Sequence, residues 1–395
     1  MKEGWEYKKL GDFCRKGKNI KWDDQTNDTS FRYIDLTSVD RNDLCIHNPQ
    51  IITKDNAPSR AKQIIQAGDI IFATTRPTLR RVSLIDEQYD GDICSTGFCV
   101  LRPNKEVKSK IIFYALLNDS FYKYIEPLQT GANYPAVTDS IVKNYIILVP
   151  PLSEQQSIVD YLDSAFAKID AMKANAEKAL NEAKALFQAS LKEMLEPKEG
   201  WEEKTLKELG QTQTGTTPSK SDKDNYGDYI PFIRPSEIDY DGSGRIEYNS
   251  ALKLSKKGAD NGRVFDAHSI YMVCIGATIG KVGYGERAIS CNQQINIFSP
   301  NSSVNYKFAY YAMKNDGFQQ KVIKEGTSSQ ATLPIINKGK WEKLCISYPP
   351  LSEQQSIVTT LDSLKSKVDK LQENYDKISQ ECDALKQAIL RQVFE

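Results

Sequence analysis

The sequence predicts a mixed α/β protein in which two globular domains are joined by two long helices that form an antiparallel coiled coil. Three observations predict this architecture. The chain contains a pseudo-twofold internal repeat, each repeat ends in a long segment with heptad spacing, and the globular parts mix short β-like runs with helical runs. A chain of 395 residues also exceeds one ordinary hydrophobic core, which favours two domains.

Two framing motifs establish the repeat. KEGWE at 2–6 returns at 198–202, and PPLSEQQSIV at 150–159 returns without change at 349–358. The spacing is far above the roughly 20–50 residues of solenoid repeats, so each copy is a whole domain with an appended element. The predicted parts are globular domains at 1–150 and 198–349, a central helix at 151–197 and a C-terminal helix at 350–395.

The start of each long helix is predicted from its proline pair and capping residues. The two prolines stop the preceding strand because proline lacks the donor that a β-ladder needs. A serine followed three residues later by glutamine is typical of a capping box. The predicted N-caps are Ser153, with Gln156, and Ser352, with Gln355.

Apolar residues then recur at alternating spacings of three and four, which indicates a coiled-coil seam. About 44 residues at about 1.5 Å each give a rod of roughly 66 Å. Such a seam needs a partner, and the other long helix is the nearest one; the alternative is that each helix packs on its own domain. The predicted seam residues are Leu162, Phe166, Ile169, Leu180 and Phe187 in the first helix, and Leu361, Leu364, Val368, Leu371, Ile378 and Leu385 in the second.

Strands and helices are both expected in the globular parts. Runs rich in β-branched and aromatic residues, at 69–73, 97–101, 145–148, 269–275 and 295–298, predict strands. Amphipathic patterns at 108–126 and 305–324 predict one helix in matching positions of each copy.

Composition narrows the function without deciding it. Lys+Arg and Asp+Glu are 52 each, which is mild evidence against DNA binding by the isolated chain but leaves room for local basic loops. The eight cysteines form no CxxC pair and there are only two histidines, so disulfides, a metal site and a Ser-His-Asp triad are all disfavoured. The sequence shows no membrane-spanning apolar run and no signal peptide, so a cytoplasmic location is expected.

Catalytic motifs are missing where an enzyme would need them. The two proline pairs, in VPPL and YPPL, lack the polar and aromatic neighbours of the loop with which amino-methyltransferases hold a flipped base. GATIGKV at 276–282 is one residue too short for a P-loop and ends in Val282 instead of Ser or Thr. The sequence therefore predicts no catalytic site.

Polar loops are the candidate binding residues. RPTLRR at 76–81 places three arginines in a loop between strands, and arginine can fork onto guanine or onto phosphate. A solvated turn is the alternative interpretation of each loop. The candidate DNA-binding residues are Arg76, Thr78, Arg80, Arg81, Asn133 and Tyr134 in the first copy, and Thr278, Lys281, Ser329 and Gln330 in the second.

The combination of motifs resembles the specificity (S) subunit of type I restriction–modification systems. That family has two target-recognition domains, each followed by a helix that opens near a PPLxEQ motif, here PPLSEQQSIV at 150 and at 349. The domain openings, GWEYKKLGD at 4–12 and GWEEKTLKEL at 200–209, also resemble the start of the family's domains. The resemblance covers nearly the whole chain.

The resemblance implies a non-catalytic subunit that reads a bipartite, asymmetric site in double-stranded DNA. Each target-recognition domain would read one half, and the helix pair would fix the gap and dock two methyltransferase subunits. Restriction subunits, which combine translocase and nuclease, would join them. S-adenosylmethionine, ATP and Mg²⁺ would then belong to partner subunits, and this chain would carry no cofactor.

Two alternatives remain open from the sequence. A coiled-coil scaffold that does not bind DNA would also explain the repeat and the balanced charge. A specificity subunit that serves a related fused nuclease–methyltransferase would have the same sequence features. The target bases and the gap length are not encoded in any motif that the sequence displays.

Overall fold

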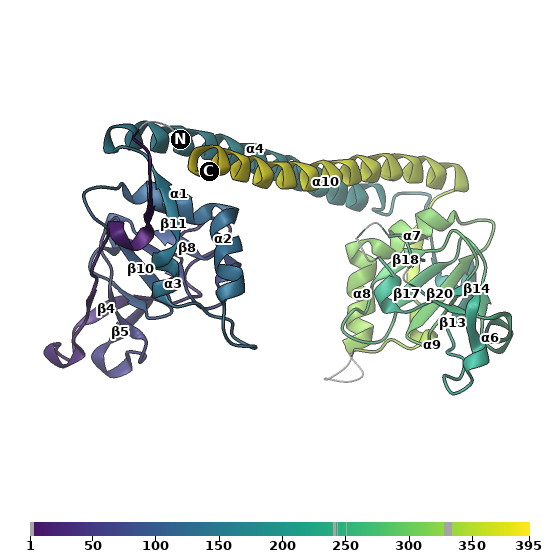
Figure 1. Ribbon diagram of the computed structural model, residues 1–395. Helices are drawn as coiled ribbons and strands as arrows, with labels where there is room; N and C mark the ends of the chain where they lie inside the picture. The colour runs from purple at the N-terminus through teal and green to yellow at the C-terminus, as the bar shows by residue number, and fades with distance from the viewer. Residues whose placement is uncertain (1–3, 240–241, 243, 250, 328–333) are drawn as a thin grey trace. The chain divides into compact units, whose positions relative to one another are not determined.

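The computed structural model describes residues 4–239, 242, 244–249, 251–327 and 334–395. The chain divides into two compact units, each described by itself below (Figure 1). The N-terminal unit consists of Met1–Asn175 together with Lys377–Glu395, and the C-terminal unit is Ala176–Asp376. Each long helix is therefore divided between the units.

The N-terminal unit contains three small sheets. One pairs β1 with β11, the second has the strand order β2-β10-β7-β8, and the third has the order β3-β6-β9-β4-β5. The strands are β1 (Glu6–Lys9), β2 (Cys14–Arg15), β3 (Lys18–Asn19), β4 (Ser30–Ile34), β5 (Gln50–Thr53), β6 (Ala61–Ile64), β7 (Ile70–Ala73), β8 (Val82–Leu84), β9 (Ile93–Ser95), β10 (Phe98–Pro103) and β11 (Ile146–Val149).

Strand β7 explains why this domain contains an uninterrupted apolar run. Ile70 and Phe72 belong to one buried cluster, and Ile71 and Ala73 belong to another. Because successive side chains of a strand point to opposite faces, β7 is covered on both faces and needs apolar residues at every position.

Three α-helices are found among the described residues of this domain: α1 (Ser109–Leu117), α2 (Asp119–Ile125) and α3 (Asp139–Asn144). The prediction of a single helix over 108–126 is therefore wrong, because one helix ends at Asn118 and a second one begins after it. Asn118 has extended dihedrals, and its side chain accepts a hydrogen bond from the Ser120 amide, so it caps a new helix.

The C-terminal unit repeats this topology, except that its third sheet has four described strands where the N-terminal unit has five. Its sheets have the orders β12-β21, β13-β20-β17-β18 and β15-β14-β19-β16. The strands are β12 (Glu202–Thr205), β13 (Gly210–Thr214), β14 (Tyr226–Ile233), β15 (Leu252–Leu254), β16 (Val264–Phe265), β17 (Ile270–Val273), β18 (Val282–Tyr284), β19 (Ile289–Cys291), β20 (Ile295–Pro300) and β21 (Cys345–Tyr348).

The helices of this domain are α5 (Leu206–Leu209), α6 (Lys256–Asn261), α7 (Tyr306–Lys314), α8 (Asp316–Thr327) and α9 (Lys338–Trp341). The helix predicted over 305–324 again breaks, here at Asn315, for which the backbone dihedrals are extended. The equivalent break in both copies shows that the asparagine, and not the amphipathic pattern, sets this helix boundary.

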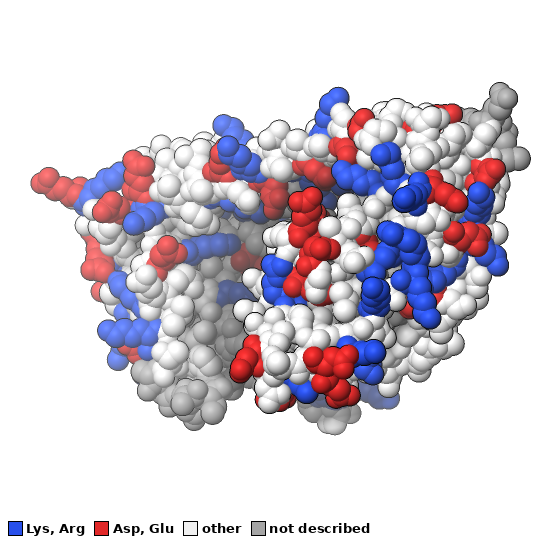
Figure 2. All heavy atoms as spheres, turned by 90° about the vertical axis from the view of Figure 1, so that its left-hand side faces the viewer, with Lys and Arg blue, Asp and Glu red and all other residues white. Residues whose placement is uncertain are grey.

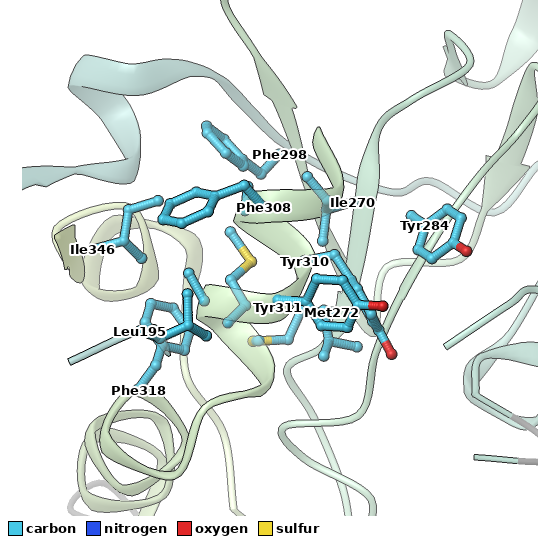
Figure 3. Close-up of a cluster of buried hydrophobic side chains, with 14 of the residues drawn as sticks. Leu195, Ile270, Met272, Tyr284, Phe298, Phe308, Tyr310, Tyr311, Phe318 and Ile346 are labelled. Atoms are coloured by element: carbon cyan, nitrogen blue, oxygen red, sulfur yellow. The ribbon is translucent and has the colours of Figure 1, made fainter. Parts of the chain in front are cut away.

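Figure 3 shows the core of the C-terminal unit, in which Phe308 and Tyr311 of α7 point toward the sheet residues Ile270, Met272 and Phe298. Leu195, which follows α4 (Leu152–Met194), lies in the same cluster. The core is therefore built from a sheet face, α7 and the end of a long helix.

The two long helices pack against each other in antiparallel fashion. They are α4, with 43 residues, and α10 (Leu351–Phe394), with 44 residues. In the N-terminal unit Lys173 of α4 pairs with Asp383 at 3.7 Å, and Asp170 pairs with Lys386, so the residue numbers run in opposite directions. The predicted mixed α/β architecture with two long packed helices is confirmed.

Each globular core also receives the start of one long helix and the end of the other. In the N-terminal unit the core contains Leu162 of α4 and Leu390 and Phe394 of α10. In the C-terminal unit it contains Phe187 of α4 and Leu361 of α10. The helices thus pack both on each other and on the domains, so both interpretations from the sequence hold for part of their length.

Most of the predicted seam residues are buried or half-buried, but Leu385 is 47% exposed and its placement in the seam is wrong. The buried face of α10 passes from Cys382 to Leu390, two steps of four residues that bypass Leu385. Lys386 takes the position between them, with its ammonium 5.1 Å from the Phe166 ring centroid.

The predicted capping boxes are also wrong. Both helices begin two residues before the position that the pattern indicates, at Leu152 and Leu351. The carbonyls of Pro151 and Pro350 accept the first helical hydrogen bonds, so these prolines hold the N-cap position.

Within the described residues, no helix is long and apolar enough to span a membrane.

Candidate nucleic-acid interface

Two polar loops of the N-terminal domain lie side by side. The β7–β8 loop (74–81) and the α2–α3 loop (129–138) are joined by a β-bridge between Thr75 and Ala136. The Arg76 amide donates to the Pro135 carbonyl at 2.7 Å, and the Val137 amide donates to the Thr74 carbonyl at 2.9 Å. We call this arrangement the paired loops; it brings together both segments that the sequence singled out.

The C-terminal domain builds its paired loops with the same backbone contacts. Ile275 and Ile335 form the bridge, and the Gly276 amide donates to the Pro334 carbonyl at 3.0 Å. Ser329 and Gln330, which the sequence nominated, lie outside the described residues. The correspondence shows that the bridge belongs to the fold and does not depend on the side chains of the loops.

The N-terminal paired loops expose five of the six nominated side chains. Arg76, Thr78, Arg80, Asn133 and Tyr134 are exposed, and Tyr134 reaches 68%. The Arg76 guanidinium lies 4.8 Å from the centroid of the Tyr134 ring, so one residue from each loop meets at the surface. Such a stack holds a guanidinium without occupying its hydrogen-bond donors.

The other two arginines are held by contacts with the domain or partly covered by it, although the Arg80 side chain stays 45% exposed. Arg80 pairs with Asp119 at 2.7 Å and stacks on Tyr122, with 4.2 Å from guanidinium to ring centroid. Arg81 is half-buried, and its Nε has no hydrogen-bond partner among the described residues. Burial raises the pKa of the Tyr122 phenol, so the ring under Arg80 stays neutral.

The C-terminal paired loops carry less charge. Thr278 is exposed and Lys281 is half-buried. The positions that correspond to Arg76 and Arg80 are occupied by Gly276 and Gly280. The two sets of loops therefore share a backbone and offer different side chains.

Basic and acidic side chains are mixed on the face of the molecule drawn in Figure 2. Figure 2 shows basic side chains interspersed with acidic ones, with the largest basic group on the right of the view. This distribution agrees with the equal numbers of basic and acidic residues in the sequence. Recognition by this chain would therefore depend on particular side chains more than on a broad positive field.

A family model described as the type I restriction modification DNA specificity domain matches residues 2–182 and 198–380. The chain belongs to this family. The two matches correspond to the two copies of the repeat, so the chain contains two specificity domains. The prediction that it is a recognition subunit and not a catalytic one is confirmed by this assignment.

Individual relatives agree with the family. The chain is 26% identical over 377 residues to the type I restriction enzyme HindI specificity subunit of Haemophilus influenzae, which covers 76% of this chain and 81% of that protein. It is 29% identical over 164 residues to the MjaIX specificity subunit of Methanocaldococcus jannaschii, which covers 41% of this chain and 37% of that protein.

Two solved structures share the fold. A chain from a study of complex assembly and conformational transition of the type I R-M system superposes with a TM-score of 0.82 at 28% identity, covering 98% of this chain and 97% of that one. The HsdS subunit from Thermoanaerobacter tengcongensis gives a TM-score of 0.60 at 27% identity, covering 100% of this chain and 97% of that one.

Within each specificity domain a buried glutamine locks the long helix to the domain. Gln155 is fully buried; its Oε1 accepts from the Lys108 amide at 2.7 Å, and its Nε2 donates to the Glu106 and Pro150 carbonyls, both at 3.0 Å. Gln354 makes the same three contacts, with the Asn305 amide and the Ser303 and Pro349 carbonyls. This role was not predicted from the sequence, although both glutamines lie in the identical decapeptide.

A second contact is also repeated at the junction between helix and domain. Asp163 of α4 accepts from Lys110 Nζ at 2.6 Å and from the Tyr114 hydroxyl at 2.7 Å. Asp362 of α10 accepts from Lys307 and Tyr311 at the same distances. The signal was a shared Lys-x₃-Tyr spacing in α1 and α7, which an amphipathic pattern alone does not reveal.

The described residues contain no candidate metal centre. Among them, no group of three or more His, Cys, Asp or Glu side chains is arranged to hold an ion. Burial raises the pKa of the Cys274 thiol to about 12, so this cysteine stays a neutral core residue. The polar side chains of the paired loops are therefore the best candidates for a functional interface.

Proposed function

We propose that this chain recognises a split, asymmetric sequence in double-stranded DNA, with each specificity domain reading one half through its paired loops. One observation carries the proposal. The two domains hold their paired loops with the same backbone contacts, whereas the side chains that the loops present are different. A constant backbone with variable side chains suits two readers of different half-sites.

The chemistry of the exposed side chains supports contact with bases. Arginine forks onto the O6 and N7 atoms of guanine, asparagine pairs with adenine, and threonine contacts base edges or the thymine methyl group. Arg76, Asn133 and Thr78 provide these groups in the N-terminal domain, and Thr278 does so in the C-terminal domain. Lys281 adds a group suited to phosphate.

The two long helices would fix the distance between half-sites and dock two methyltransferase subunits. The repeated decapeptide supports this role, because Leu152 and Leu351 are 53% and 49% exposed although they are apolar. An exposed leucine at the same place in both copies contributes little to the core and suits contact with two identical partners. Restriction subunits would join this assembly.

The catalytic cofactors would lie in those partners. S-adenosylmethionine would be bound by the methyltransferase subunits, ATP and Mg²⁺ would be used by the partner subunits, and this chain would carry none of them. Its place of action would be the cytoplasm, where the DNA of a prokaryotic cell is found.

The decisive experiment is single-molecule sequencing of DNA from cells that express the chain together with the methyltransferase encoded next to it. We expect methyladenine on a bipartite, non-palindromic motif that is absent when the methyltransferase is expressed alone. Exchange of residues 1–150 for those of a relative should alter one half of the motif only.

Two results would contradict the proposal. A stable complex of chain and methyltransferase that adds no methylation would show that the paired loops do not direct modification. Formation of no complex at all would favour the scaffold interpretation, which predicts other partners and no DNA binding.

A further inference from the structure

The β7–β8 loop of the N-terminal domain contains two arginines in a backbone conformation that favours glycine. Arg76 and Arg80 have φ values of 50° and 57°, and they flank the short 3₁₀ helix Pro77–Leu79. At the matching positions of the C-terminal domain, Gly276 and Gly280 have φ values of 103° and 90°. The same turn is therefore made with glycines in one copy and with arginines in the other.

An arginine in the left-handed region is strained, because its Cβ crowds the backbone, and glycine avoids that strain. The C-terminal copy proves that this fold accepts glycine at both positions. The arginines of the N-terminal copy are thus not required for the turn. A strained residue that the fold could replace by a relaxed one points to a role of its side chain.

Arg80 has an evident structural compensation. Its guanidinium pairs with Asp119 and stacks on Tyr122, both of α2. In the C-terminal copy the position of Tyr122 is taken by Gln319, whose Nε2 donates to the Gly280 carbonyl at 3.0 Å. Each copy therefore ties the end of this loop to the second helix of its domain, once through an arginine side chain and once through the backbone.

Arg76 has no such compensation from the interior. Its guanidinium rests on Tyr134, which is itself 68% exposed, and it forms no ion pair among the described residues. The stack fixes the plane of the guanidinium at the surface and leaves its edge available to a ligand. The tight turn at Gly131, with φ of 95°, lets the Tyr134 loop close beside it.

We infer that Arg76 is a specificity-determining residue of the N-terminal domain and reads a guanine, that Tyr134 positions its guanidinium, and that Arg80 anchors the other end of the same loop. This inference rests on the proposed function, since it assumes that the paired loops meet DNA. It gives different roles to Arg76 and Arg80, which the sequence alone does not distinguish.

The test uses the full chain with its neighbouring methyltransferase and compares Arg76→Gly with Arg76→Lys. Because glycine relaxes the turn, R76G should keep the thermal midpoint or raise it slightly, while discrimination at one G·C pair of the N-terminal half falls by about 10- to 100-fold. R76K keeps the charge without the fork, so it should relax the same position.

Arg80 provides the matched comparison. Arg80→Gly should weaken methylation of the whole motif without changing which bases are required, and Arg80→Lys, which can still pair with Asp119, should restore part of the activity. If both arginines had a purely structural role, Arg76→Gly and Arg80→Gly would each lower the thermal midpoint, and the two variants would not differ in base preference.

The outcomes separate the two levels of the proposal. A wild-type complex that methylates no bipartite motif overturns the proposed function itself. If R76G leaves the wild-type motif unchanged, the inference alone is overturned. A uniform loss of binding with the same base preferences would also overturn it, because such a loss indicates a phosphate contact. A lower thermal midpoint for R76G would show that Arg76 serves the fold.

Discussion

The two specificity domains keep the same contacts at the long helices and differ in the interior and in the paired loops. Gln155 and Gln354 lock their helices with the same three hydrogen bonds. By contrast, Arg102 and Asp69 form a buried ion pair at 2.7 Å in the N-terminal domain, with side chains 7% and 2% exposed. The glutamine contacts between helix and domain are thus the same in both copies, whereas the polar pair in the interior differs between the domains.

At the place of that ion pair the C-terminal domain has a hydrogen bond between two serines. Ser269 and Ser299 precede β17 and lie in β20, as Asp69 and Arg102 precede β7 and lie in β10, and their hydroxyls are 2.8 Å apart. A charged pair and a neutral pair both satisfy this site, because each leaves no polar group alone. At this site, each residue is therefore matched to the partner present in its own domain.

The largest expected effect is therefore that of Arg102→Ala, which leaves Asp69 buried without its partner. We expect the N-terminal unit to lose about 3–5 kcal/mol of unfolding free energy, the cost of an uncompensated buried charge. The double variant Asp69→Ser/Arg102→Ser should recover much of this loss. Hydrogen exchange resolved by mass spectrometry can assign the loss to one unit.

Ser299→Ala is the matched control in the C-terminal unit, with an expected cost of about 1 kcal/mol for one neutral hydrogen bond. Equal losses for Arg102→Ala and Ser299→Ala would show that the ion pair is not the more demanding solution, and the comparison between the two domains would then carry no lesson.

The second prediction concerns the end of the chain. Leu390 is fully buried in the core of the N-terminal unit, so Leu390→Ala should cost about 2–5 kcal/mol there. Leu385→Ala on the same helix removes a side chain that is 47% exposed and should cost far less. Faster hydrogen exchange of β7 and α1 in the first variant alone would be the expected result.

The antiparallel helix pair could be predicted from the sequence, but the exposure of Leu385 could not. A heptad pattern gives the periodicity of a helix, whereas the register of contact depends on which neighbour each turn meets. Near Leu385 the neighbour is the N-terminal domain together with α4, and the buried face turns toward Leu390. A heptad pattern predicts the buried face of a helix that packs on one straight partner helix. The prediction fails where the helix also packs on a globular domain.

The loops show the same limit for the candidate site. The sequence predicted that RPTLRR and the Asn133–Tyr134 segment are polar loops in one domain, and the bridge between Thr75 and Ala136 brings them together. Which arginine is held by an ion pair was not predictable, because Asp119 and Tyr122, which hold Arg80, lie about 40 residues away in the chain. Tertiary contacts decide the direction of a side chain.

The third prediction tests the shared contact. Gln155→Ala and Gln354→Ala each leave one amide and two carbonyls without their buried partner, so each should cost about 1–3 kcal/mol in its own unit. Gln156→Ala, one position further and exposed, is the control and should have little effect. Markedly unequal costs for the two buried glutamines would mean that the repeated contacts are not energetically equivalent.

The smallest expected effect concerns pH, and it compares the turns after β4 and β14. Burial alone would raise the pKa of Asp35, but hydrogen bonds from Thr37 and Ser38 outweigh it and leave the pKa lowered. The pKa of Glu237 is lowered in the same way, with Arg234 as the main donor. Both domains thus stabilise this turn with an ionised carboxylate.

A carboxyl group with a lowered folded-state pKa contributes stability that is complete above its unfolded-state pKa of about 4 and is lost as the pH falls through the folded-state value. Asp35→Asn should therefore destabilise the N-terminal unit at pH 6 and make its stability less dependent on pH between 5 and 3. The C-terminal unit, with Glu237 intact, should keep its pH dependence in urea titrations of the same variant. If both units of Asp35→Asn lost stability with acid as steeply as in the wild type, Asp35 would not be ionised by its turn, and the two carboxylates would not be counterparts.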